Sequence, residues 1–276
     1  MASLLRGFPA ALEPGRPGDP GLFGPDSVAW RVNGEVVLLV GAGRALLMQL
    51  AHPAVAAGVV EHSDFRDDPY ARLWRTLGTM LTVTFGDTEQ SRRAAQRVNV
   101  VHHVVRGEGY DALDPALLLW VHATLVDSAL VVHDRFVGGL SSSERERYYR
   151  DMKRQAAALR VPLSHLPGNV GEFDRYVRKQ VGSLEVSDQG RSLARKILAP
   201  PVPLPLRPAA LTFRMLTAGL LPERLRSAFG LRWGRAHELG LGTAAGLSRA
   251  VLPAVPELLR RWPAARAACR RVAAGE

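Results

Sequence analysis

From residue 26 onward the sequence carries many residues that typically start or stop a helix, and these signals restrict the chain to helical folds. Asp114-Pro115 and Asn169 are typical of a helix N-cap and first turn, and Ser141 with Glu144 three residues later is a capping-box sequence. Few segments alternate polar and apolar residues as half-buried strands do, and no hairpin turn separates two apolar runs. We therefore predict an all-α fold, with a single domain of about ten helices.

The first 25 residues differ from the rest, because glycine and proline recur too often there for a helix to form. We predict an extended Gly/Pro-rich arm over residues 1–25 and one helical domain over residues 26–276. Asp26 or Ser27 is expected to cap a first short helix, and Thr88 is expected to cap a later one. The longer helices are expected at residues 35–50, 54–61, 69–86, 88–107, 115–138, 141–160, 170–181, 188–198, 208–220, 222–228 and 236–250.

Composition indicates a globular protein, since apolar residues make up 47% of the 276 residues. Cys269 is the only cysteine, so the chain can form neither an internal disulfide nor a cysteine-based metal cluster. The N-terminal residues lack an export signal, and no uninterrupted apolar run reaches the ~18–20 residues of a membrane span. We expect a cytoplasmic protein with no transmembrane span.

The net charge of +10 is concentrated in the last third of the chain. Residues 190–276 hold 15 Lys and Arg against four acids, whereas residues 1–189 hold 21 basic and 22 acidic residues. Such an excess suits a membrane surface, nucleic acid or an acidic partner, although a solvated basic helix face is the simpler interpretation. No zinc-finger spacing or RNA-binding signature accompanies it, so we expect no nucleic-acid partner.

The predicted helix over 69–85 has two arginines and two threonines on one face. Arg72, Arg75, Thr76, Thr79 and Met80 follow the spacing i, i+3, i+4, i+7, i+8. This face suits an anion or a polar ligand group in apolar surroundings. Ordinary salt bridges to nearby aspartates are the alternative.

The predicted helix over 89–106 places a histidine among valines. Its apolar face is expected to hold Val98, Val101, His102 and Val105, with Asn99 and Arg106 flanking it, while His103 points ~100° away. A buried imidazole can offer one ring nitrogen to a metal while the other is held by a carbonyl or carboxylate. A lone histidine on such a face is more often part of the core.

The two helices together favour a haem site, because a histidine on one helix would face arginine and threonine on another. Other sites lack their signatures. The sequence contains no His-Glu-x-x-His or Glu-x-x-His pair for zinc or di-iron and no Gly-x-Ser-x-Gly elbow. Gly41-Ala-Gly43 follows no predicted strand and is not a dinucleotide loop.

Short motifs spread over residues 26–275 resemble the catalytic-domain family of the rubber oxygenases (latex-clearing proteins) and of the fungal oxygenase that cleaves a farnesyl side chain in mycophenolic acid biosynthesis. Their order and spacing carry the resemblance more than any one of them. They are Ala51-His-Pro-Ala-Val-Ala-Ala-Gly58, Glu61-His-Ser-Asp-Phe65, Asp68-Pro69, Arg72-Leu-Trp-Arg-Thr76, Phe85-Gly-Asp87, His102-x-x-Val105-Arg-Gly107, Trp120-Val-His-Ala-Thr124, Leu140, Tyr148-Tyr149, Leu221-Pro and Phe229-Gly-Leu-Arg-Trp233.

The resemblance implies a haem b protein with a globin-like helical core that uses molecular oxygen. It implies His102 as the iron ligand, with Arg106 following it, and Arg72, Arg75 and Thr76 as the polar cluster near the haem. Arg75 stands where the rubber oxygenases carry a lysine. Because a guanidinium stays protonated, it is a poor iron ligand.

The sequence therefore leads us to expect a haem b-dependent oxygenase acting on a small apolar or isoprenoid-like molecule, with oxidative cleavage of a carbon–carbon double bond as the specific expectation. Two alternatives remain at this point. One is a haem-binding sensor or carrier without turnover, and the other is an all-α interaction protein that uses its basic C-terminal third.

Overall fold

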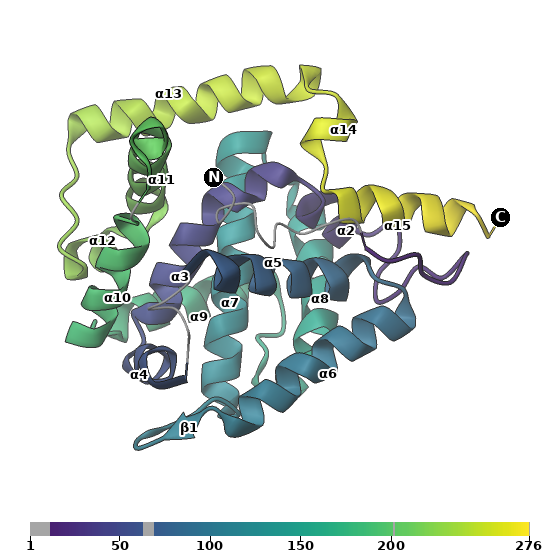
Figure 1. The fold of residues 1–276 in the computed structure, drawn as a ribbon, viewed down its shortest axis with the longest axis horizontal. Helices are drawn as coiled ribbons and strands as arrows, with labels where there is room; N and C mark the ends of the chain where they lie inside the picture. Colours follow the sequence, from purple (N-terminus) through teal and green to yellow (C-terminus); the bar gives the residue numbers. More distant parts are fainter. Residues whose placement is uncertain (1–11, 63–68, 201, 276) are drawn as a thin grey trace.

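The structure is a computed structural model that describes residues 12–62, 69–200 and 202–275. For residues 69–73 it describes only the backbone. The described chain is almost entirely helical, which confirms the predicted all-α class (Figure 1). The elements are α2 (Val28–Asn33), η1 (Val36–Gly41), α3 (Ala42–Leu50), α4 (Pro53–His62), α5 (Pro69–Phe85), α6 (Thr88–Val104), β1 (Arg106–Gly107), β2 (Tyr110–Asp111), α7 (Pro115–Val132), η3 (His133–Val137), α8 (Ser142–Ala158), η4 (Leu163–His165), α9 (Val170–Ser183), α10 (Asp188–Leu198), η5 (Leu204–Leu206), α11 (Arg207–Leu220), α12 (Glu223–Ala228), α13 (Arg235–Val251), η6 (Leu252–Ala254), α14 (Glu257–Arg260) and α15 (Pro263–Ala273).

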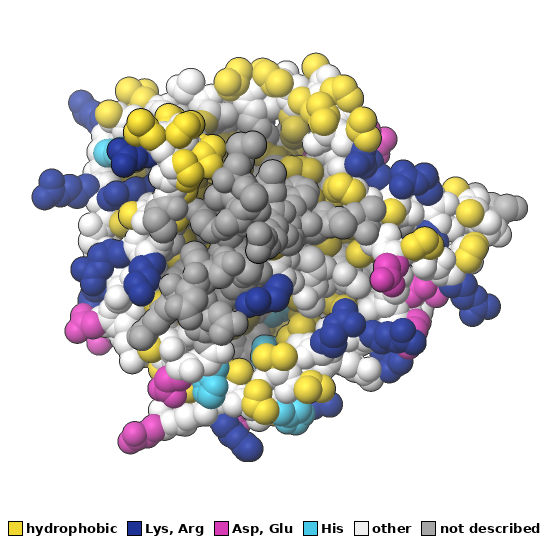
Figure 2. Space-filling view, in the orientation of Figure 1, with side chains coloured by type: hydrophobic (Ala, Val, Ile, Leu, Met, Phe, Trp, Pro, Cys, Tyr) yellow, Lys and Arg dark blue, Asp and Glu magenta, His cyan; other side chains and the backbone are white. Residues whose placement is uncertain are grey.

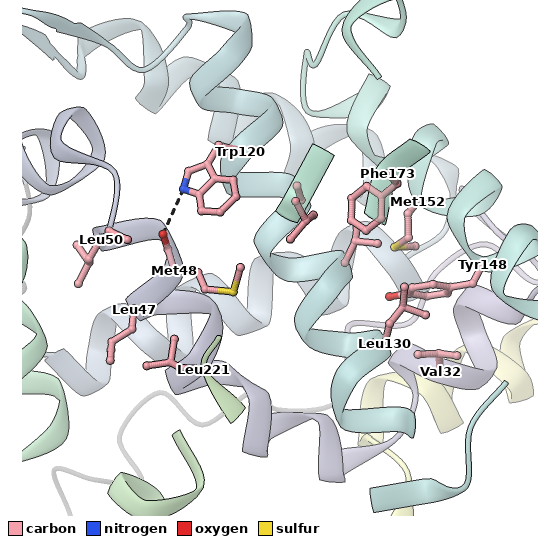
Figure 3. Packing of buried hydrophobic residues seen from close by; sticks show 14 of the residues in the cluster. Val32, Leu47, Met48, Leu50, Trp120, Leu130, Tyr148, Met152, Phe173 and Leu221 are labelled. Carbon is pink, nitrogen blue, oxygen red and sulfur yellow. Dashed lines mark hydrogen bonds between the residues drawn. The ribbon is translucent and has the colours of Figure 1, made fainter. Parts of the chain in front are cut away.

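Helix α7 is the centre of the domain, and α3, α8, α9 and η1 pack around it (Figure 1). It buries residues on every side, among them Trp120 and Leu130. The Trp120 indole N–H donates to the carbonyl of Met48 on α3 at 3.2 Å, so its one polar atom is satisfied inside the core (Figure 3). Asp114 caps the helix by accepting from the backbone N–H of Ala116, and Pro115 follows at the first position, as predicted.

A second tryptophan fixes the start of the domain to α5. Ser27 caps α2 by accepting from the backbone N–H of Trp30 at 3.1 Å. The Trp30 indole then donates to the carbonyl of Thr84 at 3.0 Å, and its ring lies 5.7 Å from that of Phe85. The C-terminal end of α5 is therefore held firmly against the core.

The described end of the predicted arm, residues 12–25, contains turns and no helix and lies across α15 and the α5–α6 connection. The backbone N–H of Arg16 donates to the Asp87 carboxylate at 2.8 Å, and that of Gly18 donates to the carbonyl of Arg271 at 2.9 Å. Gly21 has φ +74°, and a Cβ there would lie 1.9 Å from the carbonyl oxygen of Gly86. Only glycine allows this close approach. The division into arm and domain itself remains a prediction.

Several predicted boundaries were wrong by a few residues for local reasons. Residues 36–41 form a 3-10 turn before α3, and α6 is capped by Asp87 rather than Thr88, with Gln90 completing the capping box. Helix α6 also ends at Val104 rather than Gly107, because Arg106–Gly107 pairs with Tyr110–Asp111 in a short hairpin that the sequence analysis did not predict.

The C-terminal third belongs to the same core as the rest of the domain. Leu221, Leu225 and Trp262 are buried in the cluster that contains Trp30 and Trp120. Leu220 is buried in a neighbouring cluster. Leu211 is instead 65% exposed on the outer side of α11.

Truncation after Pro200 should therefore give an insoluble or molten protein. It would remove Leu221, Leu225 and Trp262 from the shared cluster and leave a large apolar surface in water. Near-UV circular dichroism and thermal unfolding measure this outcome, with full-length Leu211→Ser as a control that should unfold like the wild type. A 1–200 fragment with a cooperative unfolding transition would contradict the shared core.

Candidate functional site

Helices α5 and α6 are joined by a short turn into a helical hairpin and pack against each other. In that turn Asp87 accepts from the backbone N–H of Gln90 at 2.7 Å, and the Gln90 amide oxygen accepts from the Asp87 N–H at 3.0 Å. Farther along the pair, Met80 and Val98 pack against the same buried cluster.

The inward face of α6 is not the valine face that the sequence analysis predicted. The face instead follows the spacing of the buried residues Ser91, Ala95 and Asn99, and it ends at His102, which is half-buried in the last turn. Val101 is 56% exposed, so it lies outside this face. The Asn99 side-chain amide donates to the carbonyl of Ala158 at 3.3 Å and fixes the rotation of the helix against α8.

One ring nitrogen of His102 is left for a ligand. Its Nδ1 atom is buried and has no hydrogen-bond partner in the part of the chain that the structure describes. Burial also lowers the pKa of His102, because the charged ring loses hydration. The imidazole is therefore neutral at pH 7, which is the form that coordinates a metal.

The neighbouring His103 and Arg106 have different surroundings. The Arg160 guanidinium donates to His103 Nε2 at 2.9 Å on the surface. Arg106, predicted to follow His102 on the same helix, instead lies in β1 with its side chain exposed. Its carbonyl accepts from His62 Nε2 at 3.2 Å. His102 is thus distinguished from both by its burial.

The polar residues predicted on α5 lie in its first two turns. Arg75 and Thr76 have exposed side chains, and the carbonyl of Arg75 accepts from the Thr79 hydroxyl at 2.8 Å. Arg72 is part of α5, but its side chain lies outside the described residues. The predicted roles of Arg72, Arg75 and Thr76 beside a cofactor therefore stay predictions.

On α5, a Cβ added at Gly78 would meet no atom of the described residues within 4 Å, although Trp74 and Leu81, one turn to either side, are buried. Among the described residues no three His, Cys, Asp or Glu side chains converge as a metal site. A haem iron needs only one protein side chain, because the porphyrin supplies four nitrogens. The neutral imidazole of His102, whose Nδ1 has no partner among the described residues, fits such a group.

A second buried histidine was not singled out as a ligand by the sequence analysis. His122 lies in the middle of α7, and neither ring nitrogen completes a hydrogen bond with a described residue. Burial lowers its pKa to about 4, and the nearby Met152 backbone opposes the shift only in part. Its place in an apolar helix, two residues after Trp120, was the signal available in the sequence.

Two surface hollows lie away from α5 and α6, beside α13. Arg235, Glu238 and Leu239 line one of them. They are shallow and have no histidine lining them. The candidate site is therefore at His102 of α6 and not at these hollows.

Comparison with known proteins identifies the family of this chain. The family model described as "ER-bound oxygenase mpaB/B'/Rubber oxygenase, catalytic domain" matches residues 30–250. Two curated relatives, an uncharacterised protein of Mycobacterium tuberculosis and one of Mycobacterium bovis, are each 32% identical to this chain over 205 residues, which cover 70% of this chain and 80% of the relative. No solved structure matches the chain significantly.

The buried neutral His122 should make the fold sensitive to acid. Its pKa is below the ordinary 6.5 in the folded state, so between pH 6.5 and about 4 the unfolded chain binds a proton that the folded chain does not. The free energy of unfolding should then decrease as the pH is lowered across this range, and His122 should account for about 3 kcal/mol of the decrease.

Urea unfolding of the ligand-free protein at several pH values measures this effect. His122→Gln should lower stability at pH 7 but flatten the pH dependence, whereas His165→Gln on the surface is the matched control. An equally steep pH dependence in wild type and His122→Gln would contradict the assignment.

Proposed function

We propose a haem b-dependent oxygenase activity for this chain, which belongs to the catalytic-domain family of the ER-bound oxygenases mpaB/B' and the rubber oxygenases. The family supports an oxygenase-type function. The haem, the cytoplasmic location and a small apolar or isoprenoid-like substrate are our proposal. The observation that carries it is the buried Nδ1 of His102, in the last turn of α6, which has no partner among the described residues.

In this proposal His102 holds the cofactor by its imidazole. Its position in the last turn of α6, where Val98 and Asn99 are packed one turn earlier, fixes the ring relative to α8. A haem bound there would supply the activation of molecular oxygen that side chains cannot perform. The globin-like character of the surrounding helices belongs to the same proposal.

Arg75 and Thr76 provide hydrogen-bond donors on the opposite helix. A guanidinium and a hydroxyl can both donate to an oxygen atom of the reacting molecules or to negative charge that develops on it. Arg75 remains protonated, so it contributes donors and positive charge rather than a ligand. We propose that Arg72 binds an acidic group of the cofactor.

Apolar residues near the site suit a hydrophobic substrate. Leu77 and Met80 of α5 are only partly buried by the described residues. They offer hydrocarbon contacts and few polar partners, which favours an alkene over a charged metabolite. Cleavage of a carbon–carbon double bond is the specific reaction we propose.

His102→Ala should lose haem while keeping its fold. The visible absorption spectrum after haem reconstitution measures binding, and far-UV circular dichroism checks the fold. His103→Ala is the matched control, because His103 is adjacent and exposed, and it should retain the Soret band. An unchanged spectrum in His102→Ala would exclude it as the ligand, and loss only in His103→Ala would move the assignment by one residue.

Arg75→Ala and Thr76→Ala should keep haem but slow turnover, each by about 10²–10³-fold, as when a donor to developing charge is removed. Oxygen uptake in the presence of a short isoprenoid alkene measures the rate. Arg93→Ala, which removes an exposed arginine on α6 paired with Glu89, is the control and should retain full activity. Haem binding without any oxygen uptake in the wild type would favour the alternative of a sensor or carrier.

A further inference from the structure

Helix α13 lies along one edge of the domain, and one of its faces is fixed against the core (Figure 1). Leu241 and Ala245 are buried in a cluster with Phe136 of η3. The Ser248 hydroxyl also donates to the carbonyl of Phe136 at 2.9 Å. These contacts determine which side of α13 faces outward.

The outward face of α13 is apolar as well. Leu239 and Leu247 are two turns apart on this face, and they are 72% and 63% exposed. Small residues lie between them, at Thr243 and Gly246, and the face carries no acidic residue. A helix that is apolar on both sides needs an apolar environment on both, whereas a solvent-facing helix normally has a polar outer side.

The apolar surface continues beyond α13 onto α14. Val251 at the end of α13 is 48% exposed, and Leu258 and Leu259 of α14 are each 68% exposed. Figure 2 shows hydrophobic side chains gathered along the upper edge of the molecule, where Figure 1 places α13 and its connection to α14. We call this set the α13–α14 surface: Leu239, Leu247, Val251, Leu258 and Leu259.

Positive charge accompanies this surface. Arg235 and Arg249 lie at the two ends of α13 with exposed side chains, and neither forms an ion pair within the described part of the chain. The nearest acid on the helix, Glu238, is already engaged, since it accepts from Arg135 at 2.8 Å and from the Trp233 indole at 2.9 Å. Glu257, the acid at the start of α14, lies 3.9 Å from the Arg261 guanidinium, so Arg235 and Arg249 leave the surface electropositive as well as apolar.

An anionic membrane surface satisfies both properties together. A second copy of this chain would cover the leucines but would bring like charges toward each other, in a protein of net charge +10. A nucleic acid would neutralise the arginines but leave the leucines in water. We propose that the α13–α14 surface docks on an anionic phospholipid bilayer, with its leucines at the headgroup–acyl boundary and its arginines among the headgroups.

Vesicle co-sedimentation of the full-length chain tests this proposal and needs no assay of turnover. We expect binding to vesicles of phosphatidylcholine with one-quarter phosphatidylglycerol and much weaker binding to phosphatidylcholine alone. Added salt should weaken the binding by screening. Arg235→Gln with Arg249→Gln should lower the partition coefficient by about fivefold for each arginine.

The leucines provide the sharper test. Leu239→Ser with Leu247→Ser should reduce vesicle binding at least tenfold, by the area rule for apolar burial. Leu163→Ser is the matched control, because Leu163 is 66% exposed on η4, away from this surface, and it should bind like the wild type. All variants change exposed residues, so thermal unfolding should be unaffected.

Three results would overturn the proposal. The first is absence of binding to anionic vesicles, and the second is equal binding by the leucine double variant and the wild type. The third is a wild-type dimer in analytical ultracentrifugation that does not bind vesicles and that the double variant abolishes, since the surface would then join two copies of the chain.

Discussion

The fold depends on the burial of α7, which is apolar on nearly every side and must therefore be enclosed by other helices. The segment Pro115–Val137 is long and apolar enough by composition to cross a membrane, yet more than half of it is buried inside this domain. Such a helix cannot lie at the surface of a globular protein, so α3, α8 and α9 surround it. Its charged residue Asp127 is tolerated because Arg44 pairs with it at 2.5 Å. The same guanidinium donates to Ser128 and to the carbonyl of Leu220, which ties α3, α7 and α11 together.

The α5–α6 hairpin is held firmly against this core at the end of α5. The Thr84 hydroxyl accepts from Gln155 of α8 at 3.1 Å, and Trp30 donates to the Thr84 carbonyl, so α5 cannot shift at that end. His102, in the last turn of α6, is half-buried, and its Nδ1 has no partner among the described residues. An unsatisfied polar group on a helix whose rotation is fixed by Asn99 suits the binding of a ligand, because the supporting side chains are in place before the ligand binds.

The sequence predicted what local interactions determine. The caps at Ser27, Asp114, Ser141 and Asn169 were all predicted, because each depends on a side chain and a backbone N–H within three residues of it. The end of α6 was missed, although Gly109 in the intervening turn, at φ +77°, was a local signal for the hairpin. Tertiary contacts decide the rest. Whether Val98 or Val101 faces inward depends on the packing of α6 against α8, and the absence of a partner for His122 depends on which side chains surround α7.

The arginines of the C-terminal third fall into two groups, which only the structure distinguishes. Several of its arginines act inside the fold. Arg260 binds the buried Glu35 at 2.7 Å, while Arg261 and Arg271 donate to the carbonyls of Trp30 and Asp19, each at 2.9 Å. These contacts join the C-terminus to the beginning of the domain and use charge for structure. The arginines of α13 make no such contacts among the described residues, and they flank exposed leucines. A uniform solvated basic face would not divide the arginines in this way. One part of the positive charge stabilises the fold, and the other part lies on a surface that remains available to an anionic partner.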